Sequence, residues 1–388
     1  MFDKIKALAA EVNPYVVELR RHFHMYPESS LQEFETCKRI QQELTAMGIP
    51  FTVVKDIGVY ADIVGAAPGK TIALRADIDA LEIEEATGLP YASKNPGKMH
   101  ACGHDAHAAM LLGAAKVLLQ LKDQIKGTVR LIFQPAEESF YGAEIMIEGG
   151  CLEGVDEIFG QHVSSSAPRG LITCAPGPRM AAADLFDITV EGVSGHGSRP
   201  DLCIDAVVAT AAIVMNLQTI VSREINSADA AVVSVGKMVA GTRANIVANK
   251  GELNLSVRSY TPEMRQYLRD AIVRIATTTA ETFRAKAHVE IIPGTPPTVN
   301  DPDCAERAIG VMHELFGPDS VKATPPSPGS EDFAYYVEKV PGTFAMLGTM
   351  PEAGKAAGHT ETFDLNEEAL QDGVALHVAY ALRAQGVI

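Results

Sequence analysis

The segment TVRLIFQP, residues 128–135, narrows the possible folds most because it is apolar along nearly its whole length. A strand with one face in water alternates polar and apolar residues, whereas a strand covered on both faces reads as an almost continuous apolar run. Helices packed on both faces of a sheet provide that cover. The segment therefore predicts an α/β fold, and β patterns at 51–55, 60–64 and 71–76 predict further strands.

Two changes of sequence texture divide the 388-residue chain. A Pro/Gly turn around 176–183 precedes a fresh polar–apolar alternation, and α/β texture returns after residue 293. The units between them read as strand (185–192), helix (203–222), strand (230–239), strand (252–260), helix (262–285) and strand (287–292). This βαββαβ order is typical of a ferredoxin-like unit with an antiparallel sheet. We expect an α/β domain formed by residues 1–182 and 294–388, and an inserted α+β domain at 183–293.

Two helices are expected near the N-terminus, and a proline sets the end of the first. A helical pattern runs from Pro14 to about Tyr26, where Pro27 should end it because a proline disfavours helix in the preceding residue. A second helix is expected at 31–47. We interpret the two histidines of the first helix, His22 and His24, as structural.

The charge and the cysteines limit partners and compartment. The formal net charge of −16 argues against nucleic acid and against an anionic membrane surface as partners. No apolar run reaches membrane-spanning length, and the first residues lack the uninterrupted apolar core of a signal peptide. The six cysteines are scattered and form no CxxC pair, so reduced thiols and a cytoplasmic location are expected.

The segment MHACGHDAH, residues 99–107, has the donors of a transition-metal site. It gathers one cysteine and three histidines, Cys102, His100, His104 and His107. In an extended chain residues i and i+2 point the same way, so Cys102 and His104 could reach one metal or two neighbouring ones. Any one of these residues alone could instead be a buried structural side chain. Asp105 is expected to cap a helix that starts near Ala106.

Carboxylates follow two of the predicted strands. Asp77 and Asp79 lie at the end of one apolar strand, where a ligand crevice or an ordinary turn would explain them. Glu137 and Glu138 directly follow the strand 128–135. Because adjacent side chains point in different directions, one glutamate can bind a metal while the other moves a proton.

Two more histidines complete a candidate site. His162 ends the short strand EIFGQHV, and His359 lies in a Gly-rich loop; either could be structural when considered alone. The candidates together are Cys102, His104, Glu137, Glu138, His162 and His359. They are too many for one tetrahedral metal and suit two metals roughly 3.5–4 Å apart, bridged by a thiolate or a water. Two such ions would activate a water for amide hydrolysis, with the spare glutamate passing the proton to the leaving amine.

A family resemblance joins these motifs. The segments RRHFHMYPE, ALRADIDAL, MHACGHDAH, FQPAEES, GQHV, SGHGSRP, GTRANIV, GSEDFAYY and GHTETFDLNEEAL occur in this order between about Arg20 and Leu370. The chain resembles the two-metal amidohydrolases that include hippurate hydrolase, N-acyl-amino-acid amidohydrolases and auxin–amino-acid conjugate hydrolases. The wider family also contains carboxypeptidase G and succinyl-diaminopimelate desuccinylase.

The resemblance assigns expected roles to single residues. It implies a general base at Glu137 and metal ligands at Cys102, His104, Glu138, His162 and His359. Cys102 stands where the wider family has an aspartate. The expected metals are zinc, manganese, cobalt or nickel, without a choice among them.

The resemblance also implies a mixed-sheet, three-layer catalytic domain with an inserted ferredoxin-like lid domain that usually makes a homodimer or a higher homo-oligomer. His196 matches a lid histidine that reaches the partner's active site in dimeric relatives. Asn245 and Arg258 match positions that bind the substrate's backbone or carboxylate. Each of the three could alternatively be an ordinary surface residue.

The expected function is metal-dependent hydrolysis of the linear amide bond of N-acyl amino acids. A dipeptidase or aminoacylase of the same family is the alternative, and a non-catalytic metal-binding protein on this fold is a more distant one. Gly197–Arg199 and the run SSSAPRG after His162 depart from the family pattern. Both segments are expected to border the substrate pocket. The preference for a particular acyl group of the substrate is therefore the property that the resemblance defines least.

Overall fold

The computed structural model describes residues 1–388, apart from the side chain of Pro293, and divides into two units. The first comprises Met1–Gly177, Val299–Pro325 and Asp332–Ile388, and the second comprises Pro178–Thr298 and Pro326–Glu331. The boundaries expected from the sequence, 182/183 and 293/294, lie inside those of the second unit, which also takes the short segment 326–331.

The first unit is built on an eight-stranded mixed sheet in the order β1-β2-β4-β3-β5-β16-β6-β15. Its strands are β1 (Phe51–Val54), β2 (Gly58–Val64), β3 (Ala67–Asp77), β4 (Lys126–Gln134), β5 (Glu157–Ser164), β6 (Ile172–Thr173), β15 (Val321–Lys322) and β16 (Gly342–Gly348). The central run β4-β3-β5-β16 is parallel, so the carboxyl ends of these strands meet at one edge of the sheet.

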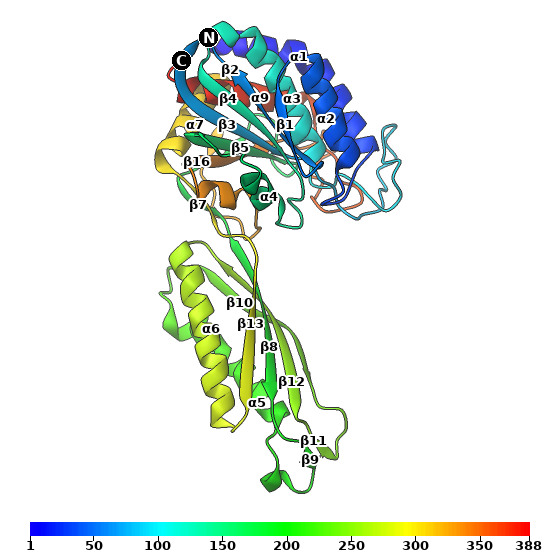
Figure 1. Ribbon diagram of the computed structural model, residues 1–388, viewed down its shortest axis with the longest axis vertical. Helices are drawn as coiled ribbons and strands as arrows, with labels where there is room; N and C mark the ends of the chain where they lie inside the picture. The colour runs from blue at the N-terminus through cyan, green and yellow to red at the C-terminus, as the bar shows by residue number, and fades with distance from the viewer. The chain divides into compact units, whose positions relative to one another are not determined.

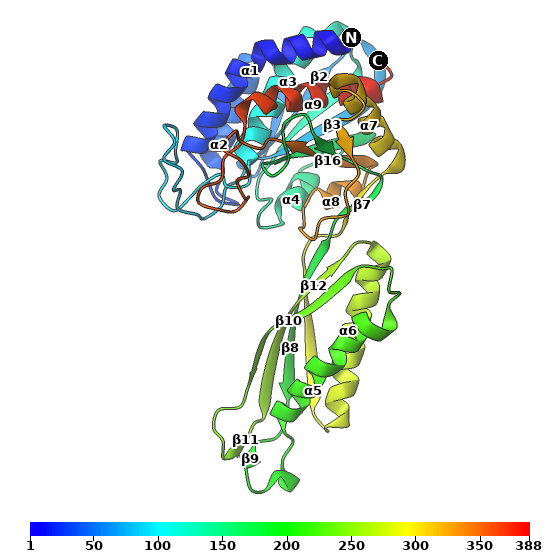
Figure 2. The same ribbon diagram turned by 180° about the vertical axis from the view of Figure 1, so that it is seen from behind.

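Helices cover both faces of this sheet, as Figures 1 and 2 show. One side carries α1 (Phe2–Met25), α2 (Phe34–Ala46), α3 (His104–Gln120), α7 (Pro302–Phe316) and α9 (Leu370–Ala384), and the other carries α4 (Gly142–Glu148) and α8 (Ala334–Val337). The short helices η1 (Lys122–Gln124) and η4 (Glu367–Ala369) lie in connections. Helix α3 is buried along almost its whole length because it is apolar on every side. The three-layer α/β prediction is confirmed.

Helix α1 corrects the helix expected at 14–26. It begins at Phe2 and runs through Pro14. An internal proline costs a helix about 3 kcal/mol because it removes a backbone hydrogen bond and clashes with the preceding turn. Buried apolar side chains at helical spacing, among them Ile5, Ala9 and Val16, pack into the core and outweigh that cost.

The second unit has the predicted βαββαβ order. Its main elements are β8 (Ala182–Glu191), α5 (Ala206–Thr219), β10 (Ala231–Ala240), β12 (Lys250–Ser259), α6 (Pro262–Thr282) and β13 (Lys286–Pro293). The sheet order is β10-β12-β8-β13, every pair is antiparallel, and α5 and α6 share a core with it. Shorter elements are β9 (Gly195–His196), η2 (Pro200–Leu202), the π-helical η3 (Ile220–Glu224) and β11 (Ile246–Val247), while β7 (Gly177–Met180) and β14 (Thr298–Asn300) each include residues of both units.

Helix α5 and η3 correct the expectation that no apolar run reaches membrane-spanning length. The stretch Ala206–Glu224 is long and apolar enough to cross a membrane, judged by length and composition alone. One side of it, with Ala209, Ile213 and Leu217, is buried in the core of the second unit. The core helix of a globular domain passes the same test, so this stretch is weak evidence for a membrane span.

Candidate metal centre

The loop before α3 brings Cys102 and His104 to the carboxyl edge of the sheet. Helix α3 begins at His104, and its N-cap is Gly103 in the left-handed conformation with φ of 96°. A side chain at this position would be strained, and its Cβ would come within 2.3 Å of Cγ2 of Val163. Glycine is therefore required between the two candidate ligands.

The N-cap of α3 is Gly103 and not, as the sequence predicts, Asp105, although Oδ1 of Asp105 accepts a hydrogen bond from the backbone N–H of Ala106 in the first turn at 2.9 Å. The carboxylate of Asp105 is buried and accepts a hydrogen bond of 2.9 Å from Nε of Arg20, and it lies 2.7 Å from Nδ1 of His24. His24 also lies 3.4 Å from Glu85. This buried network ties α1 to the start of α3. Arg20 and Glu85 have no local sequence signal for these contacts, because their partners are distant in the chain.

Two candidate ligand groups share Cys102. One is Cys102, His104 and His162, and the other is Cys102, Glu138 and His359, with ligand atoms in each group within 4.8 Å of one another. Sγ of Cys102 lies 3.3 Å from Nε2 of His162, and Nε2 of His359 lies 3.4 Å from Oε1 of Glu138. A further group joins Glu137 to His104 and Glu138. The structure thus brings together all six candidates that the sequence reading collected.

The ring nitrogens of the histidines are oriented for metal binding. Nδ1 of His104 lies 3.0 Å from the backbone oxygen of Asp79, and Nδ1 of His162 lies 2.6 Å from that of Val163. Both contacts suit the tautomer that carries its proton on Nδ1, in which Nε2 is the nitrogen available to a metal. Nε2 of His104 is buried and has no hydrogen-bond partner among the described residues. A buried nitrogen lone pair beside a thiolate and carboxylates fits a divalent transition metal.

Asp77 and Asp79 support the candidate ligands from behind. Asp77 accepts a hydrogen bond of 2.7 Å from Arg75 and binds Nδ1 of His107, whose Nε2 accepts from the backbone N–H of Val163 at 2.9 Å. His107 is thus a supporting residue rather than a ligand, as the resemblance implied. The two aspartates are therefore not simple turn residues; their contacts orient His104 and His107.

The ionisable side chains of the cluster shift one another's pKa values. Partial burial favours the neutral thiol of Cys102, but His162 and His104 outweigh it and hold the pKa of this thiol well below its ordinary value. Burial raises the pKa of Glu138. The side chain of His359 is 56% exposed, so the cluster opens to solvent on that side.

The three candidates from the inserted domain lie in the second unit. His196, on β9, is exposed, and its Nδ1 accepts from the backbone N–H of Ser198 at 3.2 Å. Asn245 is exposed and accepts, through its backbone oxygen, from Gly197 at 2.9 Å. Arg258 is half-buried on β12 and donates to the backbone oxygen of Val257.

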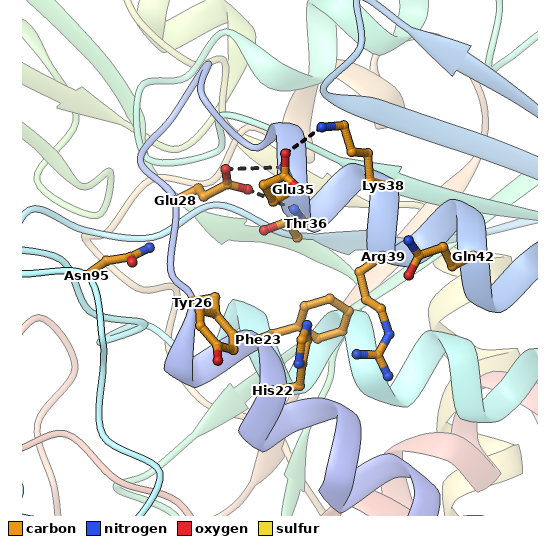
Figure 3. A pocket seen from close by; sticks show the side chains of 10 residues that line it. All are labelled: His22, Phe23, Tyr26, Glu28, Glu35, Thr36, Lys38, Arg39, Gln42 and Asn95. Atoms are coloured by element: carbon orange, nitrogen blue, oxygen red, sulfur yellow. Dashed lines mark hydrogen bonds and ion pairs between the residues drawn. The ribbon is translucent and has the colours of Figure 1, made fainter.

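A cavity of about 400 Å³ lies in the first unit, outside the metal-ligand cluster (Figure 3). It is lined by His22, Phe23, Tyr26, Glu28, Glu35, Thr36, Lys38, Arg39, Gln42 and Asn95. Lys38 pairs with Glu35, and the carboxylate of Glu28 accepts from two backbone N–H groups at the start of α2. These charges make local contacts, and none of the six candidate metal-site residues lines the cavity.

The model of the family described as Peptidase family M20/M25/M40 matches residues 73–383. The chain belongs to this family. It is therefore a metal-dependent hydrolase acting on amide bonds, and the expected resemblance is confirmed.

Relatives of this M20-family hydrolase match nearly its whole length. N-acetyl-L-cysteine deacetylase of Bacillus subtilis is 40% identical over 95% of this chain and 89% of that protein. IAA-amino acid hydrolase ILR1-like 2 of Arabidopsis thaliana is 38% identical over 97% of this chain and 87% of that protein. The crystal structure of Bacillus subtilis YxeP, described as a dinuclear metal-binding peptidase, has a TM-score of 0.87 at 37% identity and covers 98% of this chain and 100% of that one.

Proposed function

We propose that the enzyme hydrolyses the amide bond of N-acyl amino acids at a two-metal centre. The observation that carries the proposal is the pair of three-residue ligand groups that meet at Cys102. A shared thiolate suits two ions better than one. The relatives named as a deacetylase and an amino-acid conjugate hydrolase support the N-acyl amino acid as the substrate class.

The proposed ligands are Cys102, His104, Glu138, His162 and His359. The donor set of one thiolate, three imidazoles and one carboxylate suits zinc, cobalt or nickel, and manganese is the further candidate. When bound, two such ions polarise the substrate carbonyl and lower the pKa of a water molecule toward neutrality. The buried Nε2 of His104 and the low pKa of the Cys102 thiol support this assignment.

Glu137 is the proposed general base. It lies beside Glu138 at the end of β4 and is only 6% exposed. We propose that its carboxylate takes the proton from the attacking water and delivers it to the nitrogen of the leaving amino acid. The reaction then needs no covalent intermediate on the protein.

We further propose that the enzyme is a homodimer formed through the second unit. Exposed large apolar side chains lie on α5 and η3, namely Val207, Val208, Met215 and Val221, and on β10, namely Val232, Met238 and Val239. Single exposed apolar residues are ordinary, whereas a group on neighbouring elements is typical of an interaction surface. In this dimer His196 would act in the partner's active site, and Asn245 and Arg258 would bind the substrate.

Mixing two inactive variants tests the role of His196. Glu137→Gln chains keep His196, and His196→Ala chains keep Glu137, so a mixed dimer contains one intact site if His196 acts across the dimer. After subunit exchange of equal amounts, activity should return to about a quarter of the wild-type value, because half of the dimers are mixed. A mixture that stays inactive although mixed dimers form would contradict the proposal.

A substrate panel tests the function itself. The protein is reconstituted separately with zinc, manganese, cobalt and nickel and is assayed with N-acetyl and N-benzoyl amino acids and with free-amine dipeptides. We expect turnover of the N-acyl compounds. Preferred cleavage of the dipeptides would favour the dipeptidase alternative, and no turnover of any amide would overturn the proposal.

A further inference from the structure

Glu33 is a buried carboxyl group whose position the metal ligands do not explain. It is the N-cap residue of α2 and has no exposed surface. Its Oε1 accepts hydrogen bonds from the backbone N–H of Leu31 at 3.1 Å and of Ala136 at 2.7 Å. The two donors are far apart in the sequence, so one oxygen atom links the start of α2 to the end of β4.

Both donor residues have a positive φ angle, which residues other than glycine rarely adopt. Leu31 has φ of 66° and Ala136 has φ of 55°, in the left-handed region that favours glycine. Such conformations persist in other residues only where surrounding contacts hold them. The hydrogen bonds to Glu33 are contacts of this kind, and they hold both residues at once.

Ala136 directly precedes the proposed general base Glu137 and the proposed ligand Glu138. The other side of this turn is held by Asp79, whose Oδ2 accepts from the backbone N–H of Glu138 at 3.0 Å. The backbone oxygen of Ala136 also accepts from Gly142 at 3.2 Å. Glu33 and Asp79 therefore fix the backbone on either side of Glu137.

We propose that Glu33 is a positioning residue for the reaction, which sets the direction of Glu137 and Glu138 through the backbone of Ala136. This role rests on the proposed function, because it assumes that Glu137 moves the proton. Glu33 itself touches neither substrate nor metal. The property that matters is an acceptor at the position of Oε1, not a negative charge.

The surroundings of Glu33 agree with a neutral acceptor. Burial, assisted by the charge of Asp79, raises the pKa of Glu33 to about 8. Its Oε2 has no hydrogen-bond partner among the described residues. A glutamine, which keeps the acceptor and carries no charge, should therefore replace Glu33, whereas a leucine leaves two buried N–H groups unpaired.

The test compares kcat, KM and metal content of Glu33→Gln, Glu33→Leu and Glu33→Asp in the full-length, metal-loaded protein. We expect Glu33→Leu to lower kcat on an N-acyl amino acid by about 10- to 100-fold with KM little changed, because a small displacement of a catalytic group has effects of this size. Glu33→Gln should stay within about threefold of wild type. Glu33→Asp, one methylene too short to reach both N–H groups, should behave like the leucine variant.

Glu28→Gln provides a matched control. Its carboxylate accepts hydrogen bonds from the backbone N–H groups of Glu35 and Thr36 in the same segment, and among the described residues it makes no hydrogen bond to the turn at 136–138. This variant should lose some thermal stability and keep its kcat. If Glu28→Gln loses kcat as strongly as Glu33→Leu, the effect is general loosening and the proposal is wrong.

Three further outcomes would overturn the proposal. Glu33→Leu could keep its kcat, Glu33→Gln could lose as much as Glu33→Leu, or Glu33→Asp could stay fully active. The aspartate and glutamine variants decide the matter if the leucine variant does not fold. These failures differ from failure of the proposed function, in which the wild-type protein itself hydrolyses no N-acyl amino acid.

Discussion

Oδ1 of Asp79 lies 3.1 Å from Nδ1 of His104, while the other oxygen of the same carboxylate accepts from the backbone N–H of Glu138 at 3.0 Å. One buried side chain therefore orients a histidine from α3 and a glutamate from the end of β4. Neither contact is apparent from the spacing of these residues in the sequence. A metal site built in this way depends on Asp79 nearly as much as on its ligands.

Replacing Asp79 should weaken metal binding. In Asp79→Asn the side chain can turn its amide nitrogen toward His104, which frees the imidazole to adopt other tautomers and orientations. We expect metal affinity to fall by about 10- to 100-fold, as is usual for partners of metal ligands. Competition with a chelating dye measures this, and Asp62→Asn, at a surface pair with Arg130, is the control. Equal affinities in the two variants would contradict the orienting role.

Glu137→Gln should separate catalysis from metal binding. The amide cannot accept a proton, so kcat should fall by at least about 10²-fold, the lower range for losing a general base. The protein should still hold two ions per chain, measured by elemental analysis after desalting. Near-normal turnover would show that another group moves the proton, and loss of both ions would make Glu137 a ligand.

The thiolate of Cys102 should decide which metals the site prefers. Cys102→Asp keeps a negative bridging group but replaces a soft donor with a hard one, so preference should move from zinc and cobalt toward manganese. Cys102→Ala should lose the bridge and with it tight binding of the second ion. Activity profiles of both variants across the four metals provide the measurement. An unchanged metal preference in Cys102→Asp would mean that the sulfur does not contact the ions.

His377 should make the protein acid-sensitive. Burial on α9 lowers the pKa of His377 to about 3, whereas an unfolded histidine has a pKa near 6.5. The unfolded state therefore binds more protons between these values, and the folded state loses up to about 1.4 kcal/mol of stability for each pH unit as the pH falls. His377→Gln should remove this contribution to the pH dependence, measured by denaturant unfolding between pH 7 and pH 4.

The comparison for His377→Gln is the slope of stability against pH and not the stability at a single pH. His313→Gln, which changes an exposed histidine on α7, is the matched control variant. Parallel curves for wild type and His377→Gln would show that His377 does not stay neutral in the folded protein.

The candidate ligands could be found from the sequence because their signals are local. Cys102 and His104 lie two residues apart, Glu137 and Glu138 are adjacent, and each pair borders an element with a clear apolar pattern. The parallel order of the strands then brings the carboxyl ends of β3, β4 and β5 together. The fold class and the βαββαβ order followed from the same patterns.

What the sequence could not predict depends on contacts between distant residues. Arg20 reaches Asp105 across 85 positions, and Glu33 reaches Ala136 across 103. The local pattern predicts a helix-capping role for Asp105, and one of its oxygens does accept the N–H of Ala106, but the contact of its other oxygen with Arg20 has no local signal. The start of α1 at Phe2 could not be predicted, because a proline inside a helix normally interrupts it. Here the packing of α1 into the core outweighs the cost of Pro14.

The insertion of the second unit also sets the order in which the enzyme can be completed. Strand β16 lies between β5 and β6, and His359 follows β16 in the chain. The ribosome synthesises the chain from its N-terminus. The edge of β5 that pairs with β16 therefore has no partner strand while the whole second unit is synthesised. With the proposed ligand set, the metal centre can be completed only after β16 and His359 have been synthesised, and a chain that stops before β16 presents an open strand edge to other proteins.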